Sequence, residues 1–359
     1  MPRKREPRSE WCNFSQKPLK PAPKTAKSVR MPIHQLPELL INQIAAGEVV
    51  ERPSSVVKEL VENSLDAGAR SIRVALEQGG KRLVSVSDDG CGIPVEELPL
   101  ALASHATSKI NSLPDLEEVA TMGFRGEALP SMASVSRMTI TSMAAGADFA
   151  WQIKAANGKV EDAVPASGTE GTRVELRDLF YNVPARRKFM RTDQTEFKHI
   201  DELIKRFALA RPDVAFQLQH NNRMVRQFPP VSTDKEMTDR LEAVVGSEFV
   251  EHALIVDEQR GSFGLRGWVA EPRYNRAQAD RQFFFVNGRV IKDRLVAHAI
   301  RQSFRDVLFH GRHPAFVLFF ELPFTGVDVN VHPQKHEVRF RDSRAVHDFI
   351  FSTLNRSLA

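Results

Sequence analysis

The sequence predicts a mixed α+β protein with two folded regions. Short stretches of alternating apolar and polar residues, typical of strands, occur between longer stretches with apolar residues at helical spacing. Pro229-Pro230 is the clearest break in composition, and a strand–helix–strand order follows it. A chain of 359 residues is long enough for two domains with substantial cores. We therefore expect one domain over residues 31–229 and a second over residues 230–359.

The composition, 42% apolar and 26% charged residues, is ordinary for a globular protein. A net charge of +5 and a pI of 9.2 permit nucleic-acid or other anionic partners without requiring them. The sequence has no apolar run near the ~18 residues of a membrane span and no apolar secretory signal at its N-terminus. The two cysteines, Cys12 and Cys91, lie far apart, so we expect a cytoplasmic protein without a disulfide framework.

Residues 1–30 are predicted to form a disordered basic tail. They include nine Lys or Arg and five Pro, and they have too few large apolar residues to fold alone. Two alternatives are a weak nucleic-acid-binding arm and a true start of the protein at Met31.

The stretch that Pro53 opens and Gly68 closes is predicted to be an amphipathic helix. Its apolar residues fall on one broad face: Val56, Val57, Leu60, Val61 and Leu65. Glu59, Asn63 and Asp66 are spaced i, i+4 and i+7, so they form one polar stripe on the other face. By itself, such a stripe is typical of an ordinary solvated helix face.

Two alternating strands follow, over residues 71–76 and 83–88, and Gly79-Gly80 marks a hairpin turn between them. Asp88 follows two valines on the face that should point inward, because side chains repeat every second residue. A buried carboxylate without a donor is costly. We therefore expect Asp88 to have a hydrogen-bond donor beside it.

Two later segments are rich in glycine. Gly90 and Gly92 follow Asp88 and would let the backbone approach a ligand that Asp88 binds, although a simple Asp-Gly turn is the common alternative. The segment Gly123–Leu129 precedes a helix, where backbone N–H groups can hold phosphates. A flexible loop is the alternative there, and Gly123 with Gly126 would suit a hinged lid.

The remaining segments continue the alternation of strands and helices. In the first region we expect a short helix ending near Gly47, a helix over 95–104, strands over 137–142, 150–155 and 172–176, a helix over 196–210 and a hairpin over 214–228. In the second region we expect a helix over 235–245, strands over 253–257 and 264–269, an Asn-Gly hairpin over 283–291, a helix over 294–307, strands over 315–322 and 327–333, and a helix over 344–358. The apolar stripe of the 196–210 helix is expected to be core rather than a cofactor site.

Three motifs occur in a fixed order: Glu59-x-x-x-Asn63, Asp88-x-Gly90-x-Gly92 and Gly123-Phe124-Arg125-Gly126-Glu127-Ala128-Leu129. Together they resemble the ATP-binding fold shared by type II topoisomerases, large cytosolic heat-shock chaperones, histidine kinases and MutL proteins, the GHKL group. The sequence contains no Walker-type phosphate loop, which excludes a P-loop ATPase. The resemblance to MutL is closer and covers about residues 31–359, through Asn42–Val50, His105–Lys109, Leu179–Phe189 and Asn330–Phe340.

This resemblance implies a GHKL-type ATP-binding α/β sandwich, followed by a smaller ribosomal-protein-like α/β domain. It implies ATP and Mg²⁺ as cofactors. Glu59 would be the general base that activates water, and Asn63 would supply an oxygen to Mg²⁺. Asp88 would accept a hydrogen bond from the adenine amino group, with Gly90 and Gly92 beside it.

The resemblance also implies a lid over residues 104–127 that holds the phosphates. The implied nucleotide-binding residues around it are Thr107, Ser108, Lys109, Gly123, Phe124, Arg125, Gly126, Glu127, Ala128 and Leu129. Thr172 would lie near the adenine, and Lys335 of the second domain would sense the γ-phosphate and stabilise its charge. Asp66 would be a supporting residue, and Glu62, which faces nearly the same way as Glu59, is the alternative base.

As a MutL-type protein, the chain would hydrolyse ATP slowly and form a nucleotide-dependent homodimer. It would link a mismatch-recognition protein to a strand-incision nuclease or helicase. MutL proteins normally carry a C-terminal dimerisation region, in some members with a nuclease, whose features are missing from these residues. We therefore expect a chain that is monomeric without nucleotide, has no nuclease activity and binds no membrane.

Two basic clusters could bind DNA without sequence preference, and a solvated charged face is the alternative for each. The first contains Arg289, Lys292 and Arg294, and the second contains Arg186-Arg187-Lys188 with Arg191. We favour Arg294 and Arg289, which lie around a predicted turn and helix start. Binding through phosphates should weaken steeply with salt.

Two other functions stay open. One is the ATPase part of a type II topoisomerase, which the motifs at Gly123–Leu129 and Leu179–Phe189 oppose. The other is a nucleotide-dependent chaperone or scaffold without a DNA role.

Overall fold

A large sheet and a smaller one organise the chain, and helices cover both. The computed structural model describes residues 50–104, 106–107, 126–328 and 338–358, with isolated positions between residues 37 and 47. These residues belong to one compact unit, Pro37–Ala359. The predicted α+β class is confirmed. The basic tail over residues 1–30 lies outside the described residues.

Among the described residues, nine strands form the larger sheet, in the order β5-β4-β3-β7-β2-β1-β8-β9 with β6 paired to β4. Their bounds are β1 Ser71–Glu77, β2 Leu83–Asp88, β3 Arg137–Met143, β4 Ala150–Ala156, β5 Lys159–Val160, β6 Val164–Ala166, β7 Gly171–Arg177, β8 Ala215–His220 and β9 Arg223–Phe228. Strands β1 and β8 pair parallel, and the other pairs are antiparallel. The predicted long strands are all present, and the prediction missed only the short strands β5 and β6.

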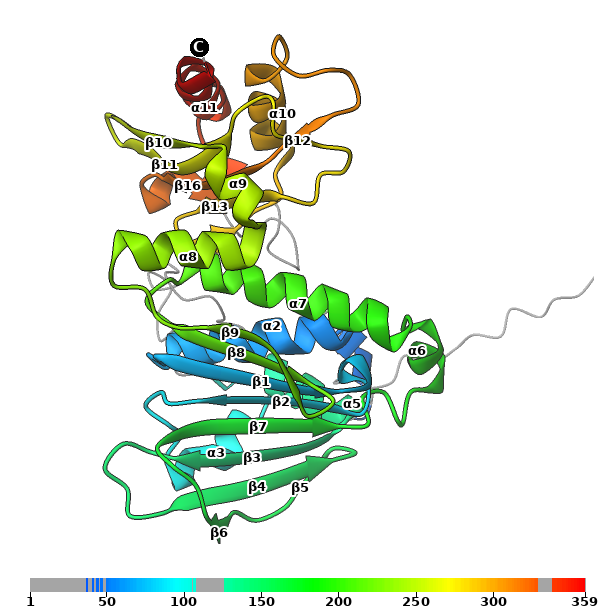
Figure 1. Cartoon of the computed structure of the whole chain (residues 1–359). Coiled ribbons are helices and arrows are strands. Elements are labelled where there is room, and N and C mark those ends of the chain that lie inside the picture. Colours follow the sequence, from blue (N-terminus) through cyan, green and yellow to red (C-terminus); the bar gives the residue numbers. More distant parts are fainter. Residues whose placement is uncertain are drawn as a thin grey trace, which may run out of the picture. The chain divides into compact units, whose positions relative to one another are not determined.

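Two long helices, α2 (Pro53–Asp66) and α7 (Asp193–Ala210), lie side by side over one face of this sheet (Figure 1). Helix α2 begins at a proline, whose missing N–H is not needed in the first turn. It ends before Gly68, which takes a φ of 77° that suits glycine. Its five predicted apolar residues are all buried. The polar stripe of α2 therefore points away from the core.

The helix predicted over residues 95–104 is shorter in the structure. A 3₁₀ turn, η2 (Val95–Glu97), leads into α3 (Leu98–Ala101). The next two backbone bonds, from Leu102 N to Pro99 O and from Ala103 N to Leu100 O, span three residues. Pro99 has no N–H to donate to the Val95 carbonyl oxygen, so the α-helical part begins only at Leu98, where Pro99 occupies the first turn. Two further helices of this region are α5 (Ala128–Val135) and α6 (Pro184–Phe189), and η1 (Gln78–Gly80) forms the predicted β1–β2 turn.

The second region begins with α8 (Asp234–Val245) and α9 (Ser247–Glu251). Its main sheet has the order β10-β11-β16-β13-β14, with β10 Ala253–Arg260, β11 Phe263–Ala270, β13 Gln282–Val286, β14 Arg289–Val290 and β16 Phe316–Glu321. Two small pairs join β12 (Asn275–Arg276) to β15 (His313–Pro314) and β17 (Val327–Asp328) to β18 (Arg339–Phe340), and η3 spans Phe324–Gly326. Helices α10 (Arg294–Ser303) and α11 (Ser343–Leu358) pack on each other (Figure 1).

The hairpin predicted around Asn287-Gly288 is present as β13 and β14. Both turn residues have a positive φ, 47° and 76°, as a two-residue hairpin turn requires. Helix α10 ends at Ser303, four residues before the predicted end. Of the strand predicted over 327–333, Val327 and Asp328 are in β17, and the rest lies outside the described residues.

The main hydrophobic cluster continues past Pro229-Pro230. It includes Leu241 and Val244 of α8 and Phe283 and Phe285 of β13, together with the residues beneath α2. Arg240, also on α8, is buried and donates to the carbonyl oxygens of Ala208, at 2.5 Å, and Pro229. Apolar packing and a buried guanidinium therefore hold α8 against the first region.

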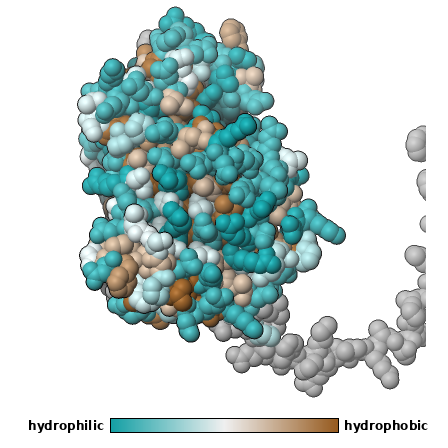
Figure 2. Space-filling view, turned by 60° about the horizontal axis from the view of Figure 1, so that its bottom comes forward, coloured by the Kyte–Doolittle hydropathy of each residue, from teal (hydrophilic) through white to brown (hydrophobic). Residues whose placement is uncertain are grey.

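The surface is mostly hydrophilic on the face that Figure 2 shows, with small separate apolar areas. In the part of the chain that the structure describes, every helix is too short or too polar to cross a membrane.

Candidate functional site

One cavity of about 1800 Å³ brings the polar side of α2 together with segments far apart in the sequence. It is lined by these predicted site residues: Glu59, Asn63, Asp88, Gly92, Thr107, Gly126, Glu127, Ala128, Leu129 and Thr172. Six others lie outside the described residues: Ser108, Lys109, Gly123, Phe124, Arg125 and Lys335. The motifs that the sequence presents separately thus meet in one place.

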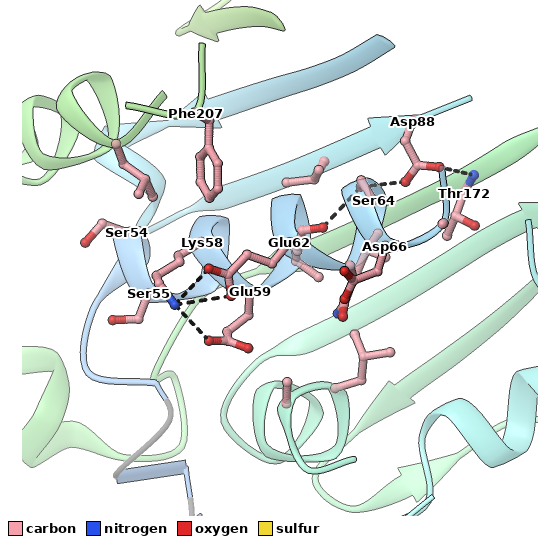
Figure 3. A pocket seen from close by; sticks show the side chains of 18 of the residues that line it. Ser54, Ser55, Lys58, Glu59, Glu62, Ser64, Asp66, Asp88, Thr172 and Phe207 are labelled. Carbon is pink, nitrogen blue, oxygen red and sulfur yellow. Dashed lines mark hydrogen bonds and ion pairs between the residues drawn. The ribbon is translucent and has the colours of Figure 1, made fainter. Parts of the chain in front are cut away.

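Asp88 is half-buried at the end of β2, after Val84 and Val86, which are buried as predicted. The Ser64 hydroxyl donates to its Oδ2 at 2.7 Å (Figure 3). Its Oδ1 accepts from the backbone N–H groups of Gly90, at 3.0 Å, and Thr172, at 3.3 Å. The expected donor is therefore present, and these bonds hold the carboxylate at the cavity wall in one orientation.

Sequence reasoning did not single out Ser64. It sits on the buried side of α2, where it is 4% exposed, and its hydroxyl also lies within 3.1 Å of the Leu60 carbonyl oxygen. A serine among buried apolar positions of an amphipathic helix is the signal that could have identified it, because such a hydroxyl needs a partner.

Ser142 of β3 was also missed. Its hydroxyl lies 2.8 Å from the Thr172 hydroxyl, accepts from the Ile93 N–H at 2.8 Å and lies 3.0 Å from the Gly171 carbonyl oxygen. This one side chain therefore ties the turn after β2 to the start of β7. Ser142 follows Met138 and Ile140 on the inward face of β3, so strand alternation was the available signal.

The two glycines after Asp88 have different structural reasons. A Cβ on Gly90 would lie 2.9 Å from the Cβ of Ala67, so the turn packs directly on the end of α2. Gly92 has a φ of 71°, and a Cβ there would lie 2.2 Å from the Met143 carbonyl oxygen. Gly92 lines the cavity, whereas Gly90 lies beneath Asp88 and is not in the wall. Close backbone packing thus explains the motif at both positions.

Lys58 lies between two glutamates of α2 (Figure 3). Its ammonium is 3.0 Å from a Glu62 oxygen and 3.6 Å from a Glu59 oxygen. Burial alone lowers the pKa of Lys58, but the charges of Glu62 and Glu59 outweigh this, so its pKa is raised above the usual value. Glu62 is only 7% exposed and has the shorter contact, so Lys58 engages it more closely than Glu59.

The cavity also has the start of α5 in its wall, at Gly126–Leu129. Backbone N–H groups of a first helical turn have no partner within the helix and suit phosphate oxygens. Glu59 and Asn63 provide carboxylate and amide oxygens in the same cavity, the donor type that Mg²⁺ prefers. The residues present therefore fit a nucleotide phosphate with Mg²⁺.

The far side of the cavity is formed by α7 and the hairpin of the second region. Leu203 and Phe207, part of the stripe predicted to be core, border the cavity as well as the core. Arg289 and Lys292 are in the wall too. Burial lowers the pKa of Arg289, and the nearby carboxylates of Glu62 and Asp66 act in the opposite direction. Arg289 therefore faces the acidic end of α2.

Comparisons with known proteins show which families this chain is similar to. Residues 51–176 match the family model of the histidine kinase-, DNA gyrase B- and HSP90-like ATPase, and residues 241–359 match that of the DNA mismatch repair protein, C-terminal domain. The DNA mismatch repair protein MutL of Azotobacter vinelandii is 58% identical over 320 residues, which is 89% of this chain and 50% of that protein. MutL of Pseudomonas putida is 57% identical over 328 residues, 91% of this chain and 52% of that protein.

Among solved structures, the Aquifex aeolicus MutL ATPase domain complexed with ADP is 30% identical, with a TM-score of 0.56. The match covers 77% of this chain and 93% of that domain. The chain belongs to the MutL family. It spans about half the length of the curated MutL relatives it matches. The N-terminal domain of a DNA repair protein, 24% identical with a TM-score of 0.71 over 88% of this chain and 97% of that one, has the same fold.

Membership of the MutL family confirms the predicted GHKL-type fold, with a mismatch-repair α/β domain after it. In this MutL chain three residues of the second basic cluster, Arg186, Arg187 and Lys188, are on α6, and Arg191 follows it. Arg186 packs over the Phe180 ring, 6.0 Å from its centroid. A Cβ on Gly47 would meet the same guanidinium. Arg186 is thus engaged within the fold.

Proposed function

We propose that this chain binds ATP and hydrolyses it with Mg²⁺, as the ATPase region of a MutL mismatch-repair protein. The observation that carries the proposal is that Glu59, Asn63 and Asp88 line one cavity with the start of α5. One site then contains a general base, a metal ligand, an acceptor for the adenine amino group and backbone N–H groups that can bind phosphate. Turnover is slow, and ATP acts as a timer for repair rather than as a fuel.

Glu59 is the proposed general base. It removes a proton from the water that attacks the γ-phosphate, which requires a carboxylate within hydrogen-bond reach of that water. Glu62 is the competing carboxylate. Its close contacts with Lys58 and its burial make it less free to reach a substrate, which favours Glu59.

Asn63 lies one helical turn after Glu59 and is the proposed ligand for Mg²⁺. When bound, the ion neutralises phosphate charge. Asp88 accepts a hydrogen bond from the adenine amino group, in the orientation that Ser64 holds, with Thr172 beside it.

The lid over residues 104–127 and Lys335 complete the proposed site, and both lie largely outside the described residues. Thr107, Gly126 and Glu127, at the two described ends of the lid, border the cavity. Closure over ATP favours a homodimer through the ATP-binding regions, so the phosphate state controls assembly. Without nucleotide the chain is monomeric.

DNA binding is proposed for the basic residues near the start of α10. Arg294 is exposed at the first position of that helix. Lys292, two residues before it, is exposed as well, although it also lines the cavity. Arg289 belongs to the same predicted group, but its position beside Glu62 and Asp66 favours a role in the cavity. Contacts to phosphates would be independent of sequence and sensitive to salt.

The wider role is to link a mismatch-recognition protein to a strand-incision nuclease or helicase in the cytoplasm, with no nuclease activity in these residues. We also propose that the ATP-binding domain ends at residue 229. In support of this boundary, β9 ends at Phe228 and α8 begins at Asp234.

The decisive experiment compares Glu59→Ala with Glu62→Gln. Glu59→Ala should bind a non-hydrolysable ATP analogue with nearly normal affinity and lose hydrolysis by about a hundredfold or more. Glu62→Gln should keep most of its hydrolysis. Full hydrolysis by Glu59→Ala would exclude Glu59 as the base, and loss only in Glu62→Gln would move that role to Glu62.

A second measurement tests the DNA role. Hydrolysis is followed with and without single-stranded DNA at two salt concentrations, for the wild type and Arg294→Ala. We expect DNA to stimulate the wild type at low salt only, and Arg294→Ala to lose the stimulation while keeping its basal rate. A rate indifferent to DNA at both salt concentrations would favour a nucleotide-dependent scaffold.

A further inference from the structure

Two histidines lie in contact where helices α10 and α11 of the second region meet. Nδ1 of His298, on α10, lies 3.1 Å from Nε2 of His347, on α11. Their rings are tilted by 32°, with centroids 5.3 Å apart. The pair borders a small pocket with Leu295, Ser343 and Arg344, separate from the cavity around Glu59. The ATPase proposal gives these side chains no role.

The two helices are held together independently of the histidines. Val296 and Ile300 of α10 and Val346 and Ile350 of α11 are buried in one hydrophobic cluster. His298 lies two residues after Val296, and His347 directly follows Val346. The backbone positions on both sides are therefore fixed by core packing, and the two imidazoles are brought together before any ligand is present.

Asp348 and Phe351 set the orientation of His347. An Asp348 carboxylate oxygen lies 3.1 Å from Nδ1 of His347, the ring nitrogen that faces away from His298. The Phe351 ring stacks on the imidazole, with centroids 6.4 Å apart and planes 13° apart. If Nδ1 donates its proton to the carboxylate, Nε2 has a free lone pair directed at His298. A carboxylate behind an imidazole is the usual support of a metal-binding histidine.

We propose that His298 and His347 together bind a divalent transition-metal ion, Zn²⁺ or Cu²⁺. With metal–nitrogen bonds of ~2.05 Å, two nitrogens 3.1 Å apart subtend an angle of about 98° at the ion. This angle lies between the square-planar arrangement that Cu²⁺ prefers and the tetrahedral one of Zn²⁺. Each metal–nitrogen bond then diverges by about 41° from the line between the two nitrogens, so the rings turn to direct their lone pairs at the ion, and His298 moves its proton from Nδ1 to Nε2 by exchange with water.

Water completes the coordination. The described residues contain no group of three or more His, Cys, Asp or Glu side chains placed to share an ion, so among these residues the proposed site has two ligands, His298 and His347. His298 is exposed and the His347 side chain is 22% exposed, which leaves solvent access to the remaining positions. Arg344 is the nearby cation, but its side chain is 93% exposed and lies 3.8 Å from Asp348, so its charge is screened by water.

The test is calorimetric titration of the tag-free chain with ZnCl₂ and, separately, CuCl₂. Excess Mg²⁺ is present to occupy oxygen-rich sites, and nucleotide is absent. We expect one ion per chain and about tenfold or greater loss of affinity in His298→Ala and in His347→Ala. Asp348→Asn should lose about tenfold, through the support it gives His347. His310→Ala, which removes an exposed histidine elsewhere in the same region, is the matched control and should bind normally.

Thermal unfolding supplies a second readout. The ion should raise the melting temperature of the wild type and of His310→Ala but not of His298→Gln, a variant of similar size that keeps the helix. Absence of binding to the wild type, or equal affinity in His298→Gln and His310→Ala, would overturn the proposal. ATP hydrolysis is not involved in either readout, so the result is independent of the proposed function.

Discussion

Replacing Ser64 with alanine isolates the hydrogen bond that holds Asp88. The hydroxyl lies 2.7 Å from the Asp88 carboxylate and is 4% exposed, so water cannot readily replace it. A hydrogen bond to a charged group contributes about 1.5–3 kcal/mol to stability. We expect Ser64→Ala to lower the free energy of unfolding by about that amount.

The same substitution should weaken nucleotide binding. Without Ser64, the Oδ2 of Asp88 loses the hydroxyl donor at 2.7 Å, and the two backbone donors both contact Oδ1. The carboxylate can then turn away from the position that the adenine needs. A loss of about 1.4 kcal/mol in binding corresponds to a tenfold weaker Kd, and we expect a change of about this size for a non-hydrolysable ATP analogue.

Ser136→Ala is the matched control. Ser136 is fully buried, and its hydroxyl donates to the Met132 carbonyl oxygen, four residues earlier, at 2.7 Å. Its hydroxyl lies beside the carbonyl oxygen four residues earlier, as the Ser64 hydroxyl lies beside that of Leu60, but it donates to that carbonyl and not to a carboxylate. We expect a cost of about 0.5–1.5 kcal/mol and unchanged nucleotide affinity. Urea unfolding and calorimetry measure both quantities, and equal effects of the two substitutions would refute the role assigned to Ser64.

Three further predictions concern the stability of the fold. Gly92→Ala should lower the free energy of unfolding in urea more than Gly68→Ala does. Both positions have a positive φ, but a Cβ on Gly92 would clash with backbone atoms, whereas a Cβ on Gly68 would have open space. Equal costs of about 1 kcal/mol would show that the close approach at Gly92 is unimportant. Burial lowers the pKa of His220, whose Nε2 accepts a hydrogen bond from the Gly79 N–H. The unfolded chain therefore takes up the proton first, and stability should fall as the pH drops below about 6.5. His220→Gln should flatten this pH dependence. Burial lowers the pKa of Arg240 to about 10. Arg240→Met should lower the free energy of unfolding by about 2–4 kcal/mol, because two carbonyl groups lose their donor. A cost below about 0.5 kcal/mol in thermal or urea unfolding would contradict this.

Local rules predicted the elements that carry the site. The apolar spacing along α2 identified the buried face and left Glu59 and Asn63 on a polar stripe. The stripe alone did not mark them as site residues; the ordered motifs that follow it did. Period-two alternation placed Asp88 on the inward face of β2 and required a donor for it. The α-helix is shorter than the predicted 95–104, because apolar spacing does not register that Pro99 has no N–H for the Val95 carbonyl oxygen and therefore belongs in a first helical turn.

The sequence by itself determined which side chains are available to the site and in what order, since the motifs are local patterns of charge, amide and glycine. Only the tertiary structure decided their partners. Ser64 reaches Asp88 across 24 positions and Ser142 reaches Ile93 across 49, and α10 meets α11 so that His298 faces His347. Such contacts depend on how the helices pack on the sheets, and side-chain burial in a packed core is a property of the whole chain that no short window of residues contains.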